Sequence, residues 1–208
     1  MVGEYYDEEE EFEPIEGYCM RCRESVDIEN AKPVWTRKGL PATRGECSIC
    51  GGTVFRMGKT HQHDEKNRPE AVHIGDDNKR NRPKLARDTV YVTYAEDDEE
   101  IAQQIAADLE KVGIAVWLHE HGGNDTSWAS GVHPALLECA RMVYVMSAEA
   151  LNNQAVIDAW TYYREQRKPI VIAQIQPVDP PDDIRRSPRF DFAQDYKRSF
   201  RAMLDVLN

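Results

Sequence analysis

The sequence predicts an α/β domain built on a parallel β-sheet, preceded by a small unit that depends on four cysteines. Three observations support this prediction. From residue 88 onward, short β-branched and aromatic runs alternate with helical patterns, which is typical of a parallel sheet covered on both faces. Upstream, two Cys-x-x-Cys pairs are separated by 24 residues. Between the two regions, residues 59–87 contain two prolines and no Phe, Tyr or Trp, which is the composition of a linker.

The composition of the 208-residue chain is that of a globular protein, with 41% hydrophobic and 30% charged residues. No run of about 18 apolar residues occurs, so we expect no membrane-spanning helix. The opening stretch, MVGEYYDEEEEFEP, is acidic and has neither the basic start nor the apolar stretch of a secretory signal. We therefore expect a cytoplasmic protein, in which cysteines remain reduced and tend to bind metal.

Charge is segregated along the chain, which the net value of −11 conceals. Residues 1–16 carry eight acids and no base, so we expect an acidic, disordered tail. Residues 17–58 and 59–87 each carry a net charge of +3, and residues 88–208 carry −9. These four segments are the predicted tail, four-cysteine unit, charged linker and α/β domain. The tail could also lie against the basic middle, or act as a binding peptide through its aromatic residues Tyr5, Tyr6 and Phe12.

The two cysteine pairs predict a structural zinc site. A Cys-x-x-Cys turn points two sulfurs in the same direction, and two such turns complete a tetrahedron around Zn²⁺ that leaves no open position for catalysis. About forty residues with few large hydrophobic side chains rarely fold unaided, whereas structural zinc supplies on the order of 10–16 kcal/mol of folding free energy. The pattern resembles the zinc-ribbon modules that bacteria append to other proteins. The predicted ligands are Cys19, Cys22, Cys47 and Cys50.

Within this ribbon, PVWTRKGLPAT at 33–43 is expected to form a hairpin that turns at Lys38-Gly39, and TVFRM at 53–57 a further strand. Basic and aromatic side chains could form a face for nucleic acid. Protein contact and structural capping are the alternatives, in which Trp35 is a core residue. The candidates for the nucleic-acid face are Trp35, Arg37, Lys38, Arg44 and Arg56.

Two histidines and a fifth cysteine are also side chains of a type that binds metal, but we do not interpret them as metal ligands. His61 and His63 could capture a metal ion, but we expect an exposed polar pair in the linker. The fifth cysteine, Cys139, falls in a helical stretch far from the others and is interpreted as a small buried hydrophobic residue.

The elements of the α/β domain follow one another in order. VYVTY at 90–94 is a buried strand, and the helix after it ends at Gly113 and presents one apolar face of Ile101, Ile105, Leu109 and Val112. Further strands are expected at 114–118, 142–147, 169–175 and 190–192. Further helices are expected at 128–140, 148–167 and 195–207, the last with Phe200, Leu204 and Leu207 facing inward.

Ligands of such sheets bind beyond the carboxyl ends of the strands, at the topological switch point. This directs attention to the residues that end the first strand and to the loop after Leu118. Neither region contains a glycine-rich phosphate loop. We interpret Gly122-Gly123 as a flexible stretch of the loop, and His119 and His121 as ordinary loop residues rather than metal ligands.

Several strings together resemble a TIR domain of the bacterial kind over residues 88–208. VYVTYAEDD is similar to the first-strand signature, with Thr93-Tyr94 in place of Ser-Tyr, and LEKVGIAVWLHE to the second box, with Ile114 in place of an aromatic residue. NDTSWASGVHPAL, MVYVMSAEAL and KPIVIAQI are similar to the strings that follow. The resemblance implies a flavodoxin-like sheet and association through faces that include the loop after the second strand. Many members of the family cleave NAD⁺.

The family resemblance also identifies where the catalytic carboxylate is expected. It belongs to a Trp-x-x-x-Glu string on the helix after the third strand. Counted from Ser147 and from Lys168-Pro169, the string falls on residues 155–159, and both signature residues are alanine, Ala155 and Ala159. Because a carboxylate near the ribose stabilises the cationic sugar, its absence predicts loss of hydrolysis.

Three other carboxylates could substitute for the missing glutamate. Asp158 is one residue away, but successive helical side chains point about 100° apart. Glu149 lies at the start of the helical region, close to the carboxyl end of the third strand, and could reach inward. Glu165 lies roughly two turns along the helix, near the opposite end of the sheet.

The sequence therefore predicts a TIR-domain signalling or assembly protein that acts through contacts with other TIR domains or with itself, as a homo-oligomer. Zinc is the expected structural cofactor. The alternatives are an NAD⁺ hydrolase of prokaryotic defence with a displaced carboxylate, and nucleic-acid binding by the ribbon that falls steeply with salt. The predicted pocket or interface residues are Tyr94, Ala95, Glu96, Trp117, His119, Ser127 and Trp128.

Overall fold

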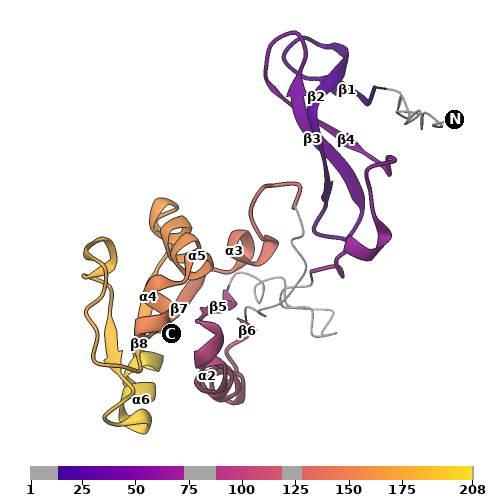
Figure 1. Ribbon diagram of the computed structural model, residues 1–208. Helices are drawn as coiled ribbons and strands as arrows, with labels where there is room; N and C mark the ends of the chain where they lie inside the picture. Colours follow the sequence, from indigo (N-terminus) through magenta and orange to yellow (C-terminus); the bar gives the residue numbers. More distant parts are fainter. Residues whose placement is uncertain (1–13, 73–87, 119–127, 208) are drawn as a thin grey trace, which may run out of the picture. The chain divides into compact units, whose positions relative to one another are not determined.

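The computed structural model describes residues 14–72, 88–118 and 128–207. These residues form two compact units, each of which is described by itself (Figure 1). Unit 1 contains residues 14–71 together with 128–131. Unit 2 contains residue 72, residues 88–118 and residues 132–207. No helix among the described residues is long and apolar enough to cross a membrane.

Unit 1 is a four-stranded antiparallel sheet in the order β1-β2-β3-β4. Its elements are β1 (Glu16–Cys19), β2 (Glu24–Trp35), β3 (Pro41–Cys47), β4 (Thr53–Met57) and the short 3₁₀ helix η1 (Glu65–Asn67). The predicted hairpin and the strand at 53–57 are confirmed. Gly39 permits the hairpin turn because its φ is +65°, a conformation that costs glycine little.

A β-bulge in β2 shapes the middle of this sheet. The register with β3 shifts between Glu29 and Lys32, and Asn30 in the bulge adopts φ +51°. Opposite the bulge, a Cβ on Gly45 would lie 2.4 Å from Ile28 Cγ2 and 2.5 Å from the Glu29 carbonyl oxygen. Only glycine fits at position 45, because any side chain would displace backbone of the neighbouring strand.

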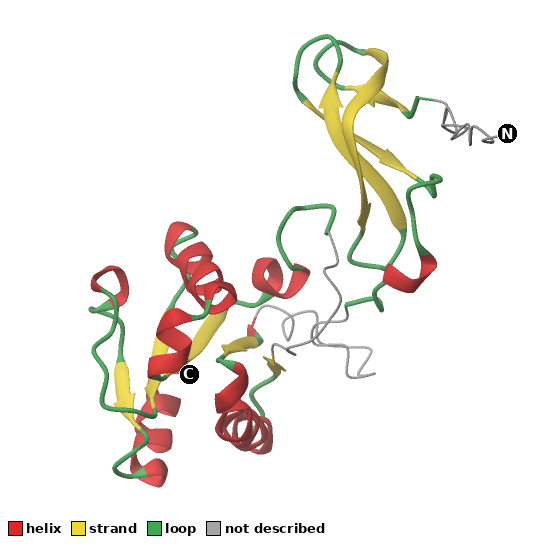
Figure 2. Cartoon of the chain, viewed as in Figure 1, coloured by secondary structure: helices red, strands yellow, loops and turns green. Residues whose placement is uncertain are grey.

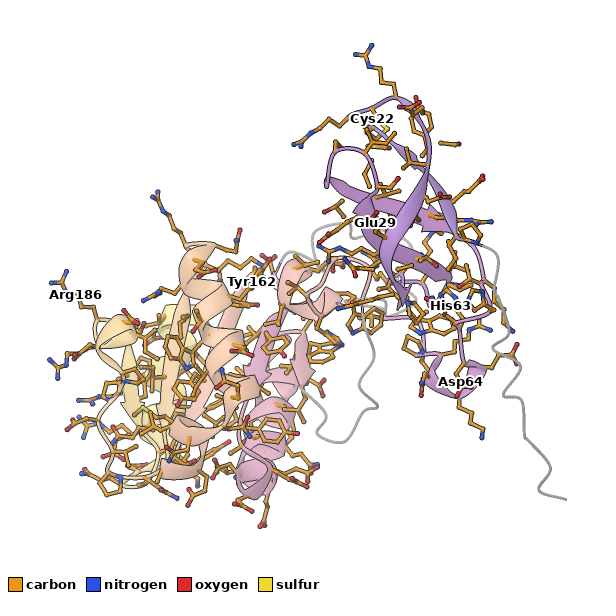
Figure 3. The ribbon with its side chains drawn as sticks, turned by 45° about the horizontal axis from the view of Figure 1, so that its top comes forward. Cys22, Glu29, His63, Asp64, Tyr162 and Arg186 are labelled. Carbon is orange, nitrogen blue, oxygen red and sulfur yellow. The ribbon has the colours of Figure 1, made fainter. Side chains whose placement is uncertain are left out.

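The expectation that His63 is exposed was wrong. Its side chain is 6% exposed, and Nε2 lies 2.8 Å from the Ala42 carbonyl oxygen of β3 (Figure 3). Its ring meets the Trp35 ring edge to face with centroids 5.4 Å apart, and Nδ1 accepts the Thr60 N–H at 3.0 Å. Residues 59–71 therefore belong to the folded part of unit 1, although their composition is that of a linker.

Unit 2 is a five-stranded parallel sheet in the order β6-β5-β7-β8-β9, with helices on both faces (Figure 2). This order, in which the first strand lies between the second and the third, confirms the predicted flavodoxin-like fold. The strands are β5 (Val90–Thr93), β6 (Val116–Leu118), β7 (Arg141–Met146), β8 (Ile170–Gln174) and β9 (Arg189–Asp191). The helices are η2 (Glu96–Asp98), α2 (Glu99–Lys111), α3 (Pro134–Glu138), α4 (Ala148–Asn152), α5 (Gln154–Glu165), η3 (Asp182–Ile184) and α6 (Tyr196–Leu207).

Successive side chains of the central strand β7 point to opposite faces of the sheet and enter two separate apolar cores. Met142, Tyr144 and Met146 point to the core that α5 covers, whereas Val143 and Val145 point to the core covered by α2 and α6. All five side chains are fully buried. β5 and β7 are neighbouring parallel strands, so their carboxyl ends lie side by side at one edge of the sheet. Folds of this kind bind their ligands at that edge.

Three helical predictions needed correction. The helix expected at 128–140 is shorter in the structure, where α3 begins at Pro134 and ends at Glu138. Residues 128–131 belong to unit 1. The region 148–167 is split at Asn153, whose Oδ1 accepts the Val156 N–H at 3.2 Å and so starts α5 as a new helix. Val112, expected on the buried face of α2, is 53% exposed because the helix ends before it.

Candidate metal centre and carboxyl-edge site

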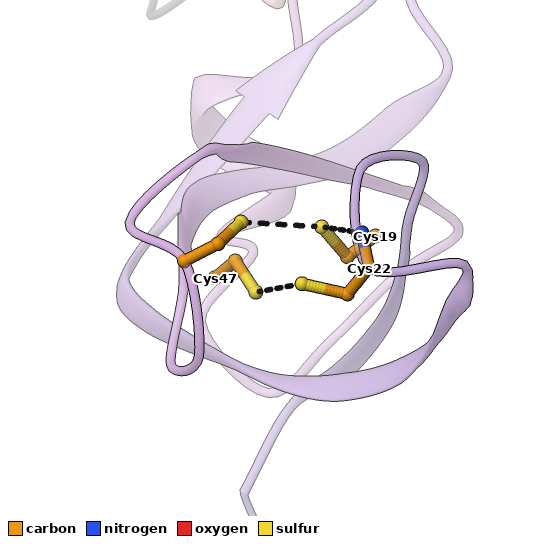
Figure 4. A group of neighbouring side chains, drawn as sticks. Cys19, Cys22 and Cys47 are labelled. Carbon is orange, nitrogen blue, oxygen red and sulfur yellow. Dashed lines mark hydrogen bonds between the residues drawn. The ribbon is translucent and has the colours of Figure 1, made fainter.

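The four predicted cysteines meet at one end of unit 1. Their sulfur atoms all lie within 4.8 Å of one another (Figure 4). The Sγ atoms of Cys19 and Cys50 are 3.7 Å apart, and those of Cys22 and Cys47 are 3.8 Å apart. An edge of about 3.8 Å belongs to a tetrahedron of sulfurs around Zn²⁺ at Zn–S distances of about 2.3 Å. The cluster therefore fits a metal ion such as zinc.

Backbone amides donate hydrogen bonds to two of the four cysteine sulfurs. The Cys22 N–H donates to Cys19 Sγ at 3.4 Å, and the Ile49 N–H donates to Cys47 Sγ at 3.4 Å. The first of these bonds is the main reason that the pKa of Cys19 is lowered to about 7, which favours the thiolate that binds metal. Gly51, with φ +65°, completes the second cysteine turn.

At the carboxyl edge of unit 2, a buried hydrogen bond joins the ends of β5 and β7. Ser147 Oγ donates to Asp98 Oδ2 at 2.5 Å and accepts the Ala150 N–H at 3.0 Å, which caps α4. Asp98 is 6% exposed and Ser147 is fully buried. Burial raises the pKa of the Asp98 carboxyl group, and the hydrogen bond from Ser147 opposes this rise.

Two of the three substitute carboxylates proposed from the sequence, Glu149 and Asp158, are exposed and already hydrogen-bonded. Glu149 Oε2 accepts from Gln176 Nε2 at 3.1 Å. Asp158 Oδ1 accepts from Gln154 Nε2 at 2.7 Å, one helical turn away on the outer face of α5. Glu165, also exposed, is the last residue of α5, at the end of the helix away from the carboxyl edge.

The two alanines of the expected Trp-x-x-x-Glu string face in opposite directions. Ala155 is exposed, whereas Ala159 is 3% exposed. Ala159 packs in the same apolar core as Tyr144 and Met146 of β7. The position expected to carry a carboxylate is therefore part of the core between α5 and the sheet.

The other predicted pocket residues are distributed over different surroundings. Tyr94 and Ala95 are buried, and Glu96 is exposed. Trp117 is partly buried and stacks on Tyr91 with ring centroids 5.1 Å apart. Trp128 belongs to unit 1 and so does not share a unit with these four residues. His119, His121, Gly122-Gly123 and Ser127 lie outside the described residues.

Sequence reasoning missed Asp98, the carboxylate at this edge that is buried. The acids from Glu96 to Glu100 form one unbroken run, and nothing in the run itself distinguishes the buried member. The available signal was indirect: a serine ends the third strand, and a serine hydroxyl next to an acid-rich first loop of a parallel sheet is a natural hydrogen-bond partner.

Negative charge dominates the described part of the carboxyl edge. The segments that follow β5, β7, β8 and β9 together hold eight acidic residues and no lysine or arginine; these segments are 94–100, 147–153, 175–179 and 192–195. A phosphate-bearing ligand is normally met by cationic side chains or by helix N-termini without competing acids. This part of the edge offers an unfavourable electrostatic environment to an anion.

Comparison with known proteins identifies unit 2. Residues 90–204 match the sequence model of the family described as the TIR domain, and the chain belongs to this family. Residues 18–57 match a family described as a domain of unknown function, DUF5679. The TIR domain of the Toll-related receptor TRR-2 from Hydra magnipapillata is similar over 58% of this chain and 98% of its own, with a TM-score of 0.48 and 17% identity. No curated protein matches the chain.

The metal site makes a direct prediction. Protein purified with zinc present should hold about one zinc ion per chain, because four cysteines fill one tetrahedral site. Cys47→Ser should lose the zinc and unfold the four-stranded sheet while unit 2 stays folded, as read by metal analysis and hydrogen exchange. Cys139→Ser, in the core of unit 2, is the control and should keep the metal. A Cys47→Ser protein with normal zinc content would refute the site.

The buried carboxyl group of Asp98 makes a prediction about pH. Burial raises its pKa above the ordinary value of 3.8, so the folded state prefers the protonated form. The stability that this group contributes is present below pH 3.8 and is lost as the pH rises through the raised pKa. Chemical denaturation followed as the pH is raised from about 3.5 to about 7 should show the wild type losing stability relative to Asp98→Asn. The exposed neighbour supplies the control, Asp97→Asn, and identical pH profiles for all three proteins would contradict this assignment.

Proposed function

We propose that this protein acts through protein–protein contacts of its TIR domain and does not cleave NAD⁺. The observation that carries the proposal is the environment of Ala159. It occupies the position expected for the catalytic glutamate and is enclosed in the core beneath α5. Cleavage of the bond between nicotinamide and ribose leaves positive charge on the sugar, and a carboxylate held beside it is what stabilises that charge. This position supplies none.

The engagement of the neighbouring carboxylates supports the same conclusion. Asp98 is at the right edge of the sheet, but it is buried and its oxygen is bound by Ser147. Glu149 and Asp158 are exposed, where water screens their charge, and each is hydrogen-bonded to a glutamine. A carboxylate displaced by even 1 Å from the reacting atom loses orders of magnitude in rate.

Electrostatics add a second, independent argument. NAD⁺ carries a pyrophosphate, and the described segments of the carboxyl edge hold eight acids without a lysine or arginine. Binding the dinucleotide there would bring two negative phosphates toward an already negative surface. The alternative of hydrolysis by a displaced carboxylate is therefore weakened at both the binding step and the chemical step.

Nucleic-acid binding by the ribbon is the weaker alternative. Base stacking requires an accessible aromatic face, and Trp35, the aromatic residue of the candidate set, is 6% exposed with its ring held against His63. The four cysteines instead support a structural role for zinc, in which the metal stabilises unit 1. We propose that unit 1 serves protein contacts.

The contact function predicts self-association through the TIR domain. Sedimentation velocity over about a hundredfold concentration range should show dimers or larger species that form with increasing concentration. Replacing residues 119–125, in the connection after β6, by Gly and Ser should reduce this association. Glu110→Ser, on the exposed end of α2, is the control and should leave it unchanged. A strictly monomeric protein, with no partner TIR domain that it binds, would refute the contact function.

A further inference from the structure

We propose that the outer edge of β2 is a docking site for an extended peptide and that residues 128–131 of the same chain are its ligand. These four residues lie in the connection between β6 and α3, yet they belong to unit 1. The site would let the ribbon hold a segment of the TIR sequence by adding it to a sheet edge.

The edge exists because β1, the partner of β2 on this side, pairs with only the first part of β2. β1 pairs with β2 only from Glu24 to Asp27, whereas β3 pairs with the other side as far as Trp35. Beyond the bulge at Asn30, one edge of β2 therefore has no strand of the ribbon beside it among the described residues. Such an edge presents backbone donors and acceptors that an incoming strand can satisfy.

Residues 128 and 129 occupy the end of this edge. The Ala129 N–H donates to the Trp35 carbonyl oxygen at 2.9 Å, and Trp128 forms a parallel bridge with Trp35. The segment then turns back, because the Gly131 N–H donates to the Trp128 carbonyl oxygen at 2.8 Å. These are the main-chain contacts of a short added strand that ends in a tight turn.

The receiving residues are rigid. Trp35 is 6% exposed, and its ring is fixed against His63, whose Nε2 is itself 2.8 Å from the Ala42 carbonyl oxygen. A buried anchor of this kind places the Trp35 carbonyl oxygen in one position, so an incoming N–H meets a preorganised acceptor.

Side chains give the site its selectivity. Trp128, Lys32 and Arg44 line one cavity of about 420 Å³ against the face of β2 and β3. Gly131 adopts φ +74°, and a Cβ there would lie 2.8 Å from Arg44 Nη1. The edge thus fits a peptide with a tryptophan at the bridging position and a glycine three residues later, as in WASG at 128–131.

Docking has a consequence that rests on the proposed function. The connection after β6 is the region that we propose for contacts between TIR domains. A segment of it that pairs with the ribbon is withheld from those contacts, so ribbon docking and TIR association compete. Zinc, by stabilising the ribbon, would favour the docked state.

Hydrogen exchange on the full chain tests the docking. In the wild type, the hydrogen-bonded amides of Ala129 and Gly131 should exchange at least about tenfold more slowly than unprotected amides. Ala129→Pro removes the N–H that Trp35 accepts and should abolish this protection, while Ala129→Ser keeps the N–H and should retain it. Gly131→Val, which places a β-branched residue at φ +74°, is a second variant and should also abolish it. The amides between β2 and β3 should stay protected throughout, which shows that the ribbon is folded.

Two results would overturn the proposal. One is unprotected exchange of residues 128–131 in the wild type with a folded ribbon, and the other is unchanged protection in Ala129→Pro. Sedimentation of the same variants tests the competition separately: Ala129→Pro should associate at lower concentration than Ala129→Ser. Equal association of the two variants would overturn the competition but leave the docking intact. If no variant associates, the predicted self-association fails, whereas the exchange result still decides the docking.

Discussion

The hydrogen bond between Ser147 and Asp98 is the interaction on which the carboxyl edge of the TIR domain depends. It joins the residue that follows β7 to the loop that follows β5, and the same hydroxyl caps α4. The two strands are neighbours at the switch point of the sheet, so this bond joins the strand ends beside which such folds bind ligands. It also engages the buried carboxylate of the edge. The bond therefore gives Asp98 a structural role at this edge.

Ala159, which stands where the family resemblance places a glutamate, lies in an apolar environment. Its methyl group packs in the apolar core that also holds Tyr144 and Met146 of β7. Burying an unpaired carboxylate there would cost several kcal/mol, which the helix would avoid only by moving outward. We therefore expect Ala159→Glu to destabilise the domain. The side chains of this core pack around the alanine.

Much of the architecture could be predicted from the sequence because it depends on local patterns. The spacing of Cys19, Cys22, Cys47 and Cys50 predicted the cysteine cluster, and the alternating strands and helices predicted the parallel sheet. The errors concern contacts between distant residues. His63 has a polar neighbourhood in sequence but is buried by Trp35 and Ala42, which lie 28 and 21 residues away. Trp128 sits in a helical pattern, but its backbone pairs with a strand that the local sequence does not reveal.

The measurement that tests the central claim most directly is the release of nicotinamide from NAD⁺ by the purified, zinc-containing chain. The wild type should release nicotinamide no faster than buffer does, and Asp98→Asn, Glu149→Ala and Asp158→Ala should not differ from it. A carboxylate that acts in the reaction contributes about 10²–10⁴-fold to the rate. Release well above the buffer rate that falls by such a factor in one of the three variants would contradict the account and identify the carboxylate that acts on the ribose.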